Sequence, residues 1–333
     1  MGAARRPGRA RRADQDEGRE TARSPSSHPR FTAGLLTDAV LAWVESPFQL
    51  LSAAEWAHAA GRRIAVAMRL SGPQMETTAA ELLRRGAPFS EVTPWVGVPW
   101  GRLADEREWA IGDGFSGQFR MAITARRPRR VALLDDGANT LALADALLGR
   151  TPFRRPRREE GRAARLLGDL ARHRLHSLAD REALELFTVF PLGAPRTDAL
   201  AARGIATRRH SFAWTRSAAV PLALPGDRVL LGSALPTDGH VPIPEYLRWV
   251  AGQAADGAVV YLPHRRERRD VLDAVRRMPG VHVLETGLPV ELVLAGIRRP
   301  IELVSLQTSA ATTLELLLGG TGSVIRQTAL ADA

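Results

Sequence analysis

Short apolar runs that alternate with helical segments are the feature that most constrains the fold of this chain. Residues 38–44 and 63–68 are two such runs, and a helical segment at 48–60 separates them. Ser46 and Pro47 are suited to begin that helix, because a serine hydroxyl caps free amides and proline fits the first helical turn. An apolar run without polar alternation is typical of a strand that is buried on both faces of a parallel sheet. This segment therefore predicts a β-α-β unit.

The same alternation continues along the rest of the chain. We expect further strands at 130–134, 228–231, 258–262, 281–284, 301–305 and 323–326. We expect further helices at 77–86, 116–126, 139–149, 243–255, 267–277, 289–296 and 310–318. Repeated alternation of this kind predicts an α/β fold with doubly wound parallel sheets. The arginine-rich stretch at 150–180 is compatible with a helix or a loop.

A linker divides the alternating pattern into two halves. Residues 221–226 contain two prolines and a glycine, which interrupt regular structure. We therefore predict two Rossmann-like domains that face a cleft, at 38–222 and 226–333. Residues 1–37 are rich in arginine and glycine and contain few large apolar side chains, so we expect a disordered basic arm there.

Composition limits the classes of protein that this chain can belong to. The formal net charge is +10, yet all 46 basic residues are arginine, which indicates GC-rich coding as much as an acidic partner. Nucleic-acid binding is an alternative, but the basic residues are scattered and aromatic residues make up only 5% of the chain, so nucleic acid is not the expected partner. The chain has no cysteine, which excludes disulfides, thiolate metal sites and cysteine nucleophiles.

The sequence also bears on location. No apolar run approaches the roughly 20 residues that span a bilayer, and the N-terminus has no apolar core of a secretory signal. The expected location is the cytoplasm, with peripheral contact between the basic arm and an anionic inner-membrane surface as an added option.

Polar residues directly after the predicted strands are the candidates for function, because ligands of open α/β sheets bind beyond the carboxyl ends of the strands. Asp135 and Asp136 follow one buried run, and Gly137 allows a tight turn after them. Like charges raise the pKa of one carboxyl group, which suits a general base. The alternative is that Asp136 caps the helix that begins near Asn139.

Two further strand ends carry groups that suit a phosphate. His264 and Arg265 follow the strand at 258–262, and an imidazole and a guanidinium can both bind phosphate oxygens. Thr308 and Ser309 precede a helix, whose free amides favour an anion. The alternatives are a solvated arginine-rich surface at the first place and ordinary helix capping at the second.

Three more residues are weaker candidates. Gly232 and Ser233 form a turn after a strand, where glycine permits the close approach of a ligand or of a neighbouring segment. Glu291 stands in the first turn of a predicted helix, where a carboxylate can bind ribose hydroxyls. A plain turn is at least as good an interpretation of the first two residues, and a plain helix start is the better interpretation of Glu291 taken singly.

The order of these motifs resembles that of bacterial sialyltransferases and capsule polysialyltransferases. Asp135-Asp136-Gly137 is similar to their acidic motif, Pro263-His264-Arg265 to their His-Pro motif and Thr308-Ser309 to their Ser-Ser/Thr motif. The resemblance spans residues 38–320. One departure is Arg265, which stands where the family has the proline that stiffens the turn.

The beginning of the chain carries the same resemblance. Glu45-Ser46-Pro47-Phe48-Gln49 is similar to the start of the polysialyltransferase-like family, where the first strand leads into a Ser-Pro-x-Gln helix. Gly112-Asp113 fits a Gly-Asp element upstream of the acidic motif. Ser46, Pro47, Gln49 and Gly137 are accordingly expected on the acceptor or structural side of the site.

The resemblance implies a GT-B fold and an inverting transfer without metal or cofactor. The donor would be a CMP-activated acidic sugar, such as sialic acid or another nonulosonic acid, and the acceptor a glycan or glycolipid. The alternatives are a UDP- or GDP-sugar donor, a non-catalytic member of a capsule assembly complex, and the nucleic-acid binder.

The resemblance also implies roles for the candidate residues. Asp135 or Asp136 would be the base, with Asp135 preferred. His264 would donate a hydrogen bond or a proton to the departing phosphate. The groups that would hold the CMP moiety are Thr308, Ser309 and Arg265 for the phosphate and Glu291, Gly232 and Ser233 for the cytidine.

Overall fold

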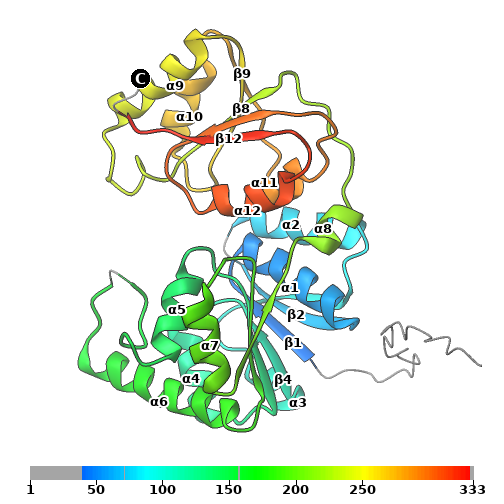
Figure 1. Ribbon diagram of the computed structural model, residues 1–333, viewed down its shortest axis with the longest axis vertical. Helices are drawn as coiled ribbons and strands as arrows, with labels where there is room; N and C mark the ends of the chain where they lie inside the picture. Colours follow the sequence, from blue (N-terminus) through cyan, green and yellow to red (C-terminus); the bar gives the residue numbers. More distant parts are fainter. Residues whose placement is uncertain (1–39, 71, 157, 331–333) are drawn as a thin grey trace, which may run out of the picture. The chain divides into compact units, whose positions relative to one another are not determined.

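A computed structural model describes residues 40–70, 72–156 and 158–330 (Figure 1). The predicted arm at 1–37 lies outside the described residues. Twelve strands and twelve helices are described, and every strand pairing within the two sheets is parallel.

The first sheet has seven strands in the order β3-β2-β1-β4-β5-β6-β7. Its strands are β1 (Val40–Val44), β2 (Ile64–Arg69), β3 (Phe89–Trp95), β4 (Glu108–Ile111), β5 (Arg130–Leu133), β6 (Leu184–Thr188) and β7 (Ile205–Arg209). Its helices are α1 (Pro47–Ala60), α2 (Pro73–Arg84), α3 (Trp100–Asp105), α4 (Gly117–Ala125), α5 (Asn139–Leu147), α6 (Arg162–Ala179), α7 (Ala194–Ala202) and α8 (Ala213–Ser217).

The second sheet has five strands in the order β10-β9-β8-β11-β12. Its strands are β8 (Arg228–Leu231), β9 (Val259–Leu262), β10 (Val281–Val283), β11 (Glu302–Ser305) and β12 (Val324–Gln327). Its helices are α9 (Ile243–Ala255), α10 (Arg269–Arg276), α11 (Val290–Leu294) and α12 (Ala310–Leu318).

These two sheets confirm the predicted fold class, a GT-B-like pair of Rossmann-like α/β sheets in one chain. The expected strands and helices are present, with boundaries that shift by a few residues. The helix expected at 77–86 begins earlier, at Pro73, because that proline occupies its first turn. The arginine-rich stretch at 150–180, which was compatible with a helix or a loop, contains α6. Strands β3, β4, β6 and β7 were not expected from the sequence.

The start of α1 forms as the sequence predicts. Ser46 caps the helix by accepting a hydrogen bond from the Gln49 amide at 3.3 Å, and Pro47 occupies the first turn. Gly61 ends the helix in the left-handed conformation, with φ of 64°. Most of α1 is buried, including the polar side chains of Gln49 and Glu55.

None of the helices in the described part of the chain is both long enough and apolar enough to cross a membrane.

Candidate active site

Each sheet has one point where the chain reverses the direction in which it adds strands. In the first sheet this point lies between β1 and β4, and in the second between β8 and β11. Ligands of doubly wound sheets bind outside the carboxyl ends of the strands at such a switch point. Most of the candidate residues follow β1, β5, β8, β9 and β11, at or next to these two places.

Gln49 of α1 links two strand ends of the first sheet. Its side-chain oxygen accepts a hydrogen bond from the Glu45 amide at 2.7 Å, and its side-chain nitrogen donates one to Oδ1 of Asp136 at 2.6 Å. A Cβ atom on Gly112 would lie 2.4 Å from the Gln49 oxygen, so only glycine fits at that position. The predicted motifs after β1, β4 and β5 therefore meet around one buried amide.

Asp136 presents its carboxylate at the surface of this cluster. Its side chain is 20% exposed, and Oδ2 accepts a hydrogen bond from the Asn139 side chain at 3.0 Å. Burial raises the pKa of Asp136, and the hydrogen bonds from Gln49 and Asn139 oppose that shift. The helix-cap interpretation is wrong, because α5 begins after Ala138 without any side-chain cap.

Asp113 and Arg155 complete the cluster. The Arg155 guanidinium binds Oδ2 of Asp113 and lies 3.5 Å from Oδ2 of Asp136. Burial raises the pKa of Asp113 to about 6, and the charge of Asp136 contributes to the increase, whereas Arg155 opposes it. Two carboxyl groups that titrate together thus share one arginine counter-ion.

Asp135 has a different environment from its neighbour. It is fully buried, and its oxygens accept hydrogen bonds from Thr140 at 3.1 Å and from the Val189 amide at 2.6 Å. Oδ2 also lies 3.1 Å from Nε2 of His210, whose ring stacks on Phe187. Asp135 therefore joins the end of β5 to the segments after β6 and β7, and its surroundings do not support the preference for it as the base.

The His264 loop follows β9 in the second sheet. Nδ1 of His264 accepts a hydrogen bond from the Arg266 amide at 3.1 Å, so the neutral ring carries its proton on Nε2. Burial, together with the charges of Arg265 and Arg266, lowers the pKa of His264 to about 4. At neutral pH this ring is an uncharged hydrogen-bond donor.

Gly232 supports that loop by its lack of a side chain. A Cβ atom there would lie 2.6 Å from both the His264 amide nitrogen and a carboxylate oxygen of Glu267. The close approach that the sequence predicts is therefore made by a neighbouring segment of the protein. The next residue, Ser233, donates its backbone amide to the Tyr246 hydroxyl at 3.1 Å.

Thr308 and Ser309 lie before α12. The Thr308 hydroxyl accepts a hydrogen bond from the Ala310 amide at 3.3 Å, as in ordinary capping. Ser309 is exposed, and its hydroxyl makes no capping bond. That hydroxyl lies 3.6 Å from where a Cβ of Gly137 would stand, which brings the acidic motif and the Ser-Thr motif together.

Arg265 is a second link between the two predicted halves of the site. Desolvation lowers the pKa of its guanidinium and Arg266 lowers it further, whereas the carboxylate of Asp136 raises it. Asp136 is thus within electrostatic range of the arginine that replaces the family's proline.

Glu291 is less accessible than a ribose ligand would need. It is 5% exposed, and its carboxyl group accepts a hydrogen bond from the Thr313 hydroxyl at 2.7 Å. Burial raises the pKa of Glu291, and the bond from Thr313 opposes that shift. In this structure Glu291 joins α11 to α12.

Arg155, Asn139 and His210 were missed by the sequence reasoning. Arg155 stands in an arginine-rich loop, where no local pattern distinguishes it from its neighbours. Arg120 fixes that loop, because its buried guanidinium donates hydrogen bonds to Glu160 at 2.8 Å and to the carbonyl of Phe153 at 3.4 Å. Asn139 was detectable, since it lies three residues after Asp136 at the start of a predicted helix.

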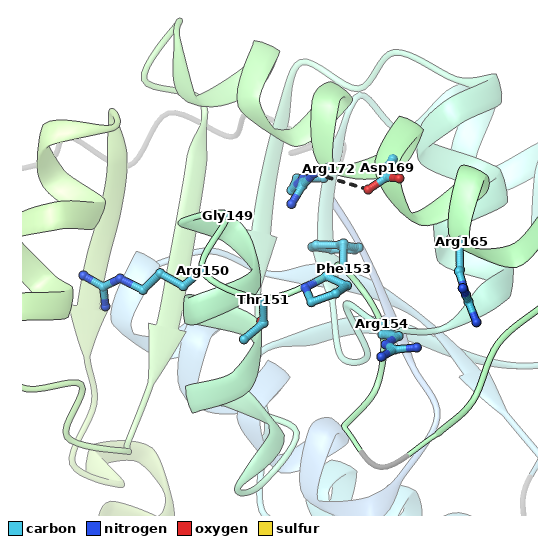
Figure 2. Close-up of a pocket in the computed structure, with 9 residues that line it drawn as sticks. Gly149, Arg150, Thr151, Phe153, Arg154, Arg165, Asp169 and Arg172 are labelled. Carbon is cyan, nitrogen blue, oxygen red and sulfur yellow. Dashed lines mark hydrogen bonds and ion pairs between the residues drawn. The ribbon is translucent and has the colours of Figure 1, made fainter. Parts of the chain in front are cut away.

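A cavity of about 470 Å³ lies beside α6, and its lining residues do not include those of the acidic cluster. It is lined by residues 149–154 and by Arg165, Asp169 and Arg172 (Figure 2). Within the part of the chain that the structure describes, no group of three or more His, Asp and Glu side chains is arranged to hold a metal ion.

No family model matches the sequence, and no curated protein matches it. Solved structures are similar in fold. A UDP-GlcNAc 2-epimerase from Neisseria meningitidis bound to UDP-GlcNAc has a TM-score of 0.49 at 10% identity, over 82% of this chain and 78% of the other. E. coli heptosyltransferase WaaC with ADP-2-deoxy-2-fluoro heptose has a TM-score of 0.38 at 14% identity, over 87% and 93%. Phytolacca americana UGT2 complexed with UDP-2fluoro-glucose and pterostilbene has 0.44 at 10%, over 87% and 86%. At these identities the similarity concerns the fold alone.

Proposed function

We propose that this chain is an inverting glycosyltransferase that moves a sialic acid or related nonulosonic acid from a CMP-sugar to a hydroxyl of a glycan or glycolipid. The observation that carries the proposal is the environment of Asp136. This carboxylate is partly exposed at the carboxyl edge of the first sheet and is held by Gln49 and Asn139, and its pKa is raised. Arg265 and Ser309, from motifs of the second sheet, are associated with the same loop.

Asp136 is the base in this mechanism. A carboxylate with a raised pKa takes a proton more readily than an ordinary aspartate. The acceptor oxygen bonds to the anomeric carbon while the bond from that carbon to the phosphate oxygen breaks. The bonding electrons leave with CMP, and the acceptor proton goes to Asp136. Asp135 holds the strand end in place.

His264 acts on the leaving group as a hydrogen-bond donor. Its pKa of about 4 leaves the ring neutral at pH 7, so Nε2–H can donate a hydrogen bond to the phosphate but has no extra proton to transfer. Arg265 supplies the positive charge that a departing phosphate needs. The exposed Ser309 hydroxyl at the start of α12 is a further donor, and Thr308 shapes that turn.

The identity of the donor nucleotide has a direct test. The purified protein is melted with CMP, CDP, UDP and GDP in turn, because a ligand that binds the folded state raises the melting temperature. A shift with CMP and CDP alone supports the CMP-sugar donor. A shift with UDP or GDP replaces it with a UDP- or GDP-sugar transferase. A folded protein that shifts with none of them contradicts both.

A matched pair of variants links binding to this site. Arg265→Gln removes the charge next to the acidic loop, whereas Arg298→Gln removes an exposed charge elsewhere in the second half. We expect the CMP-dependent shift to decrease in the first variant and to persist in the second. An equal shift in both would contradict the role of Arg265.

A further inference from the structure

Helix α6 exposes two leucines one turn apart. Leu166 is 61% exposed and Leu170 is 44% exposed, whereas the opposite face of the helix is buried through Ala171, Leu175 and Leu178. Residues that are four apart lie on the same face of a helix, so the two leucines form one apolar ridge. Nothing in the described part of the chain covers this ridge.

Basic residues flank the ridge. The sequence of α6 carries arginine at 162, 165, 172 and 174, and Asp169 is its only acidic residue. At 100° per residue, Arg162 and His173 lie beside the leucines, Arg165 and Arg172 lie on one side of them, and Arg174 lies on the other. An exposed apolar ridge with cations beside it is typical of helices that lie in a membrane interface.

The cavity beside α6 extends the basic surface. Four arginines line it, namely Arg150 and Arg154 from the loop after α5 and Arg165 and Arg172 from α6 (Figure 2). Within the described residues, the Arg154 side chain makes no hydrogen bond. A second hollow of about 380 Å³ shares Asp169 and Arg172 with the first and adds the guanidinium of Arg203 to its lining.

We propose that this surface, which comprises Leu166, Leu170 and the arginine-lined cavity, docks the protein on an anionic membrane. The leucines enter the boundary between headgroups and acyl chains, and the cavity arginines bind phosphates of anionic lipids. A nucleic acid would match the charge of this surface, but it would leave both leucines in water. The inference does not rest on the proposed transferase activity.

The first test measures binding of the full chain to vesicles. Flotation with phosphatidylcholine vesicles is compared with flotation on vesicles that also contain phosphatidylglycerol, and only the anionic vesicles are expected to carry the protein. Leu166→Ser/Leu170→Ser should reduce the partition coefficient at least ~10-fold, because apolar burial in the interface is lost. Leu83→Ser is the matched control, since Leu83 is 48% exposed on α2.

The leucine variant also separates this surface from the basic arm at 1–37. Any attraction of the arm to an anionic surface would come from its arginines, which are unchanged in that variant. Unaltered binding of Leu166→Ser/Leu170→Ser would therefore overturn the proposal.

The second test addresses the arginines. Arg154→Ala/Arg172→Ala should weaken binding to anionic vesicles several-fold, while Arg298→Ala should not. A protein that is stabilised by inorganic phosphate but does not float with anionic vesicles would show that the cavity takes a free anion, and the membrane proposal would then be wrong. Binding of duplex DNA in preference to anionic vesicles would overturn it equally.

Discussion

Two adjacent aspartates in this protein have opposite environments. Both residues follow the end of β5 at Leu133, and their side chains enter different surroundings. Asp135 is directed inward, where hydroxyl, amide and imidazole donors surround it. The Asp136 side chain lies at the carboxyl ends of the strands, where it is partly exposed and a ligand can reach it. The two carboxylates should therefore respond differently to the same substitution.

We expect Asp136→Asn to lower kcat by about 10²- to 10⁴-fold while the melting temperature stays within a few degrees, because only the base is lost. Asp135→Asn should instead lower the free energy of unfolding by about 3 kcal/mol, because donors around a buried carboxylate lose their partner. Transfer assays and urea unfolding of both variants check this. A catalytic loss in Asp135→Asn without loss of stability would reverse the two roles.

The pH profile of kcat/KM should fall on the acid side at a pH above the ~3.9 of an ordinary aspartate. The base must be ionised, and burial raises the pKa of Asp136. Activity should therefore be lost as pH falls through the raised pKa of Asp136.

Replacement of Arg155 should shift the pH profile of kcat/KM in a direction that the structure determines. Its charge lowers the pKa of both Asp113 and Asp136. Arg155→Gln should therefore move the acid limb of kcat/KM to higher pH, while Arg154→Gln, whose side chain lines the cavity beside α6, should leave it unchanged. A limb that stays in place in Arg155→Gln would show that this arginine does not control the base.

At the scale of helices and strands, a continuous apolar run makes a strand predictable, and burial alone does not. The buried central strands β4 and β6 were missed because β4 has only four residues, beginning with Glu108, and Glu185 interrupts β6. The strands that were predicted, such as β1 and β9, are apolar runs buried on both faces. β3 and β7 were missed because they lie at the edges of the sheet, where one contains Pro94 and exposed polar residues and the other ends in two arginines. Edge strands lose the continuous apolar signal, since one side of each is not covered by a neighbour.

Site residues could be predicted from the sequence when they directly follow or begin a predicted strand or helix. Gln49, Asp136 and His264 are anchored to the ends of predictable elements, so their sequence positions indicated their places. Arg155 reaches the site from a loop whose course depends on the buried ion pair between Arg120 and Glu160, whose side chains are 6% and 7% exposed. A pairing across 40 residues has no local sequence signal.

The close contact between Gly112, which follows β4, and Gln49 of α1 can be tested by substitution. In Gly112→Ala, the new methyl group would lie 2.8 Å from Cβ of Gln49 and must displace that side chain. We expect a loss of about 1–3 kcal/mol in stability from overpacking, together with lower activity because Asp136 loses its donor.

Gly101→Ala is the control for that substitution. Gly101 lies inside α3, and a Cβ there meets nothing within 4 Å, so the change should stabilise the protein by up to about 1 kcal/mol. Urea unfolding measures the stability of both variants, and transfer assays measure their activity. Full activity in Gly112→Ala would show that the position of Gln49 does not affect the base.

At the scale of the whole molecule, the two sheets share one apolar core. A single cluster of buried side chains includes Ala42 and Val66 from the first sheet and Val229 and Leu303 from the second. The residues that connect the sheets are also held by backbone contacts, because the Leu222 amide donates to the carbonyl of Gly296 at 3.1 Å. Both features couple the unfolding of one half to that of the other.

The glycines at this connection test the coupling. A Cβ on Gly296 would stand 1.8 Å from the carbonyl oxygen of Val220, which is a backbone atom and cannot turn aside as a side chain can. Gly296→Ala must therefore push the connecting segment away, at a cost of about 3 kcal/mol. A Cβ on Gly226, in the same segment, would lie 3.5 Å from Val260, an ordinary contact, so Gly226→Ala should be nearly neutral.

Calorimetry should show one transition for the unaltered protein and for Gly226→Ala. Gly296→Ala should unfold at a lower temperature and in two steps, because the displaced segment no longer transmits unfolding between the sheets. Two transitions in the unaltered protein would contradict the coupling, since the shared core would then be too weak to join the two halves.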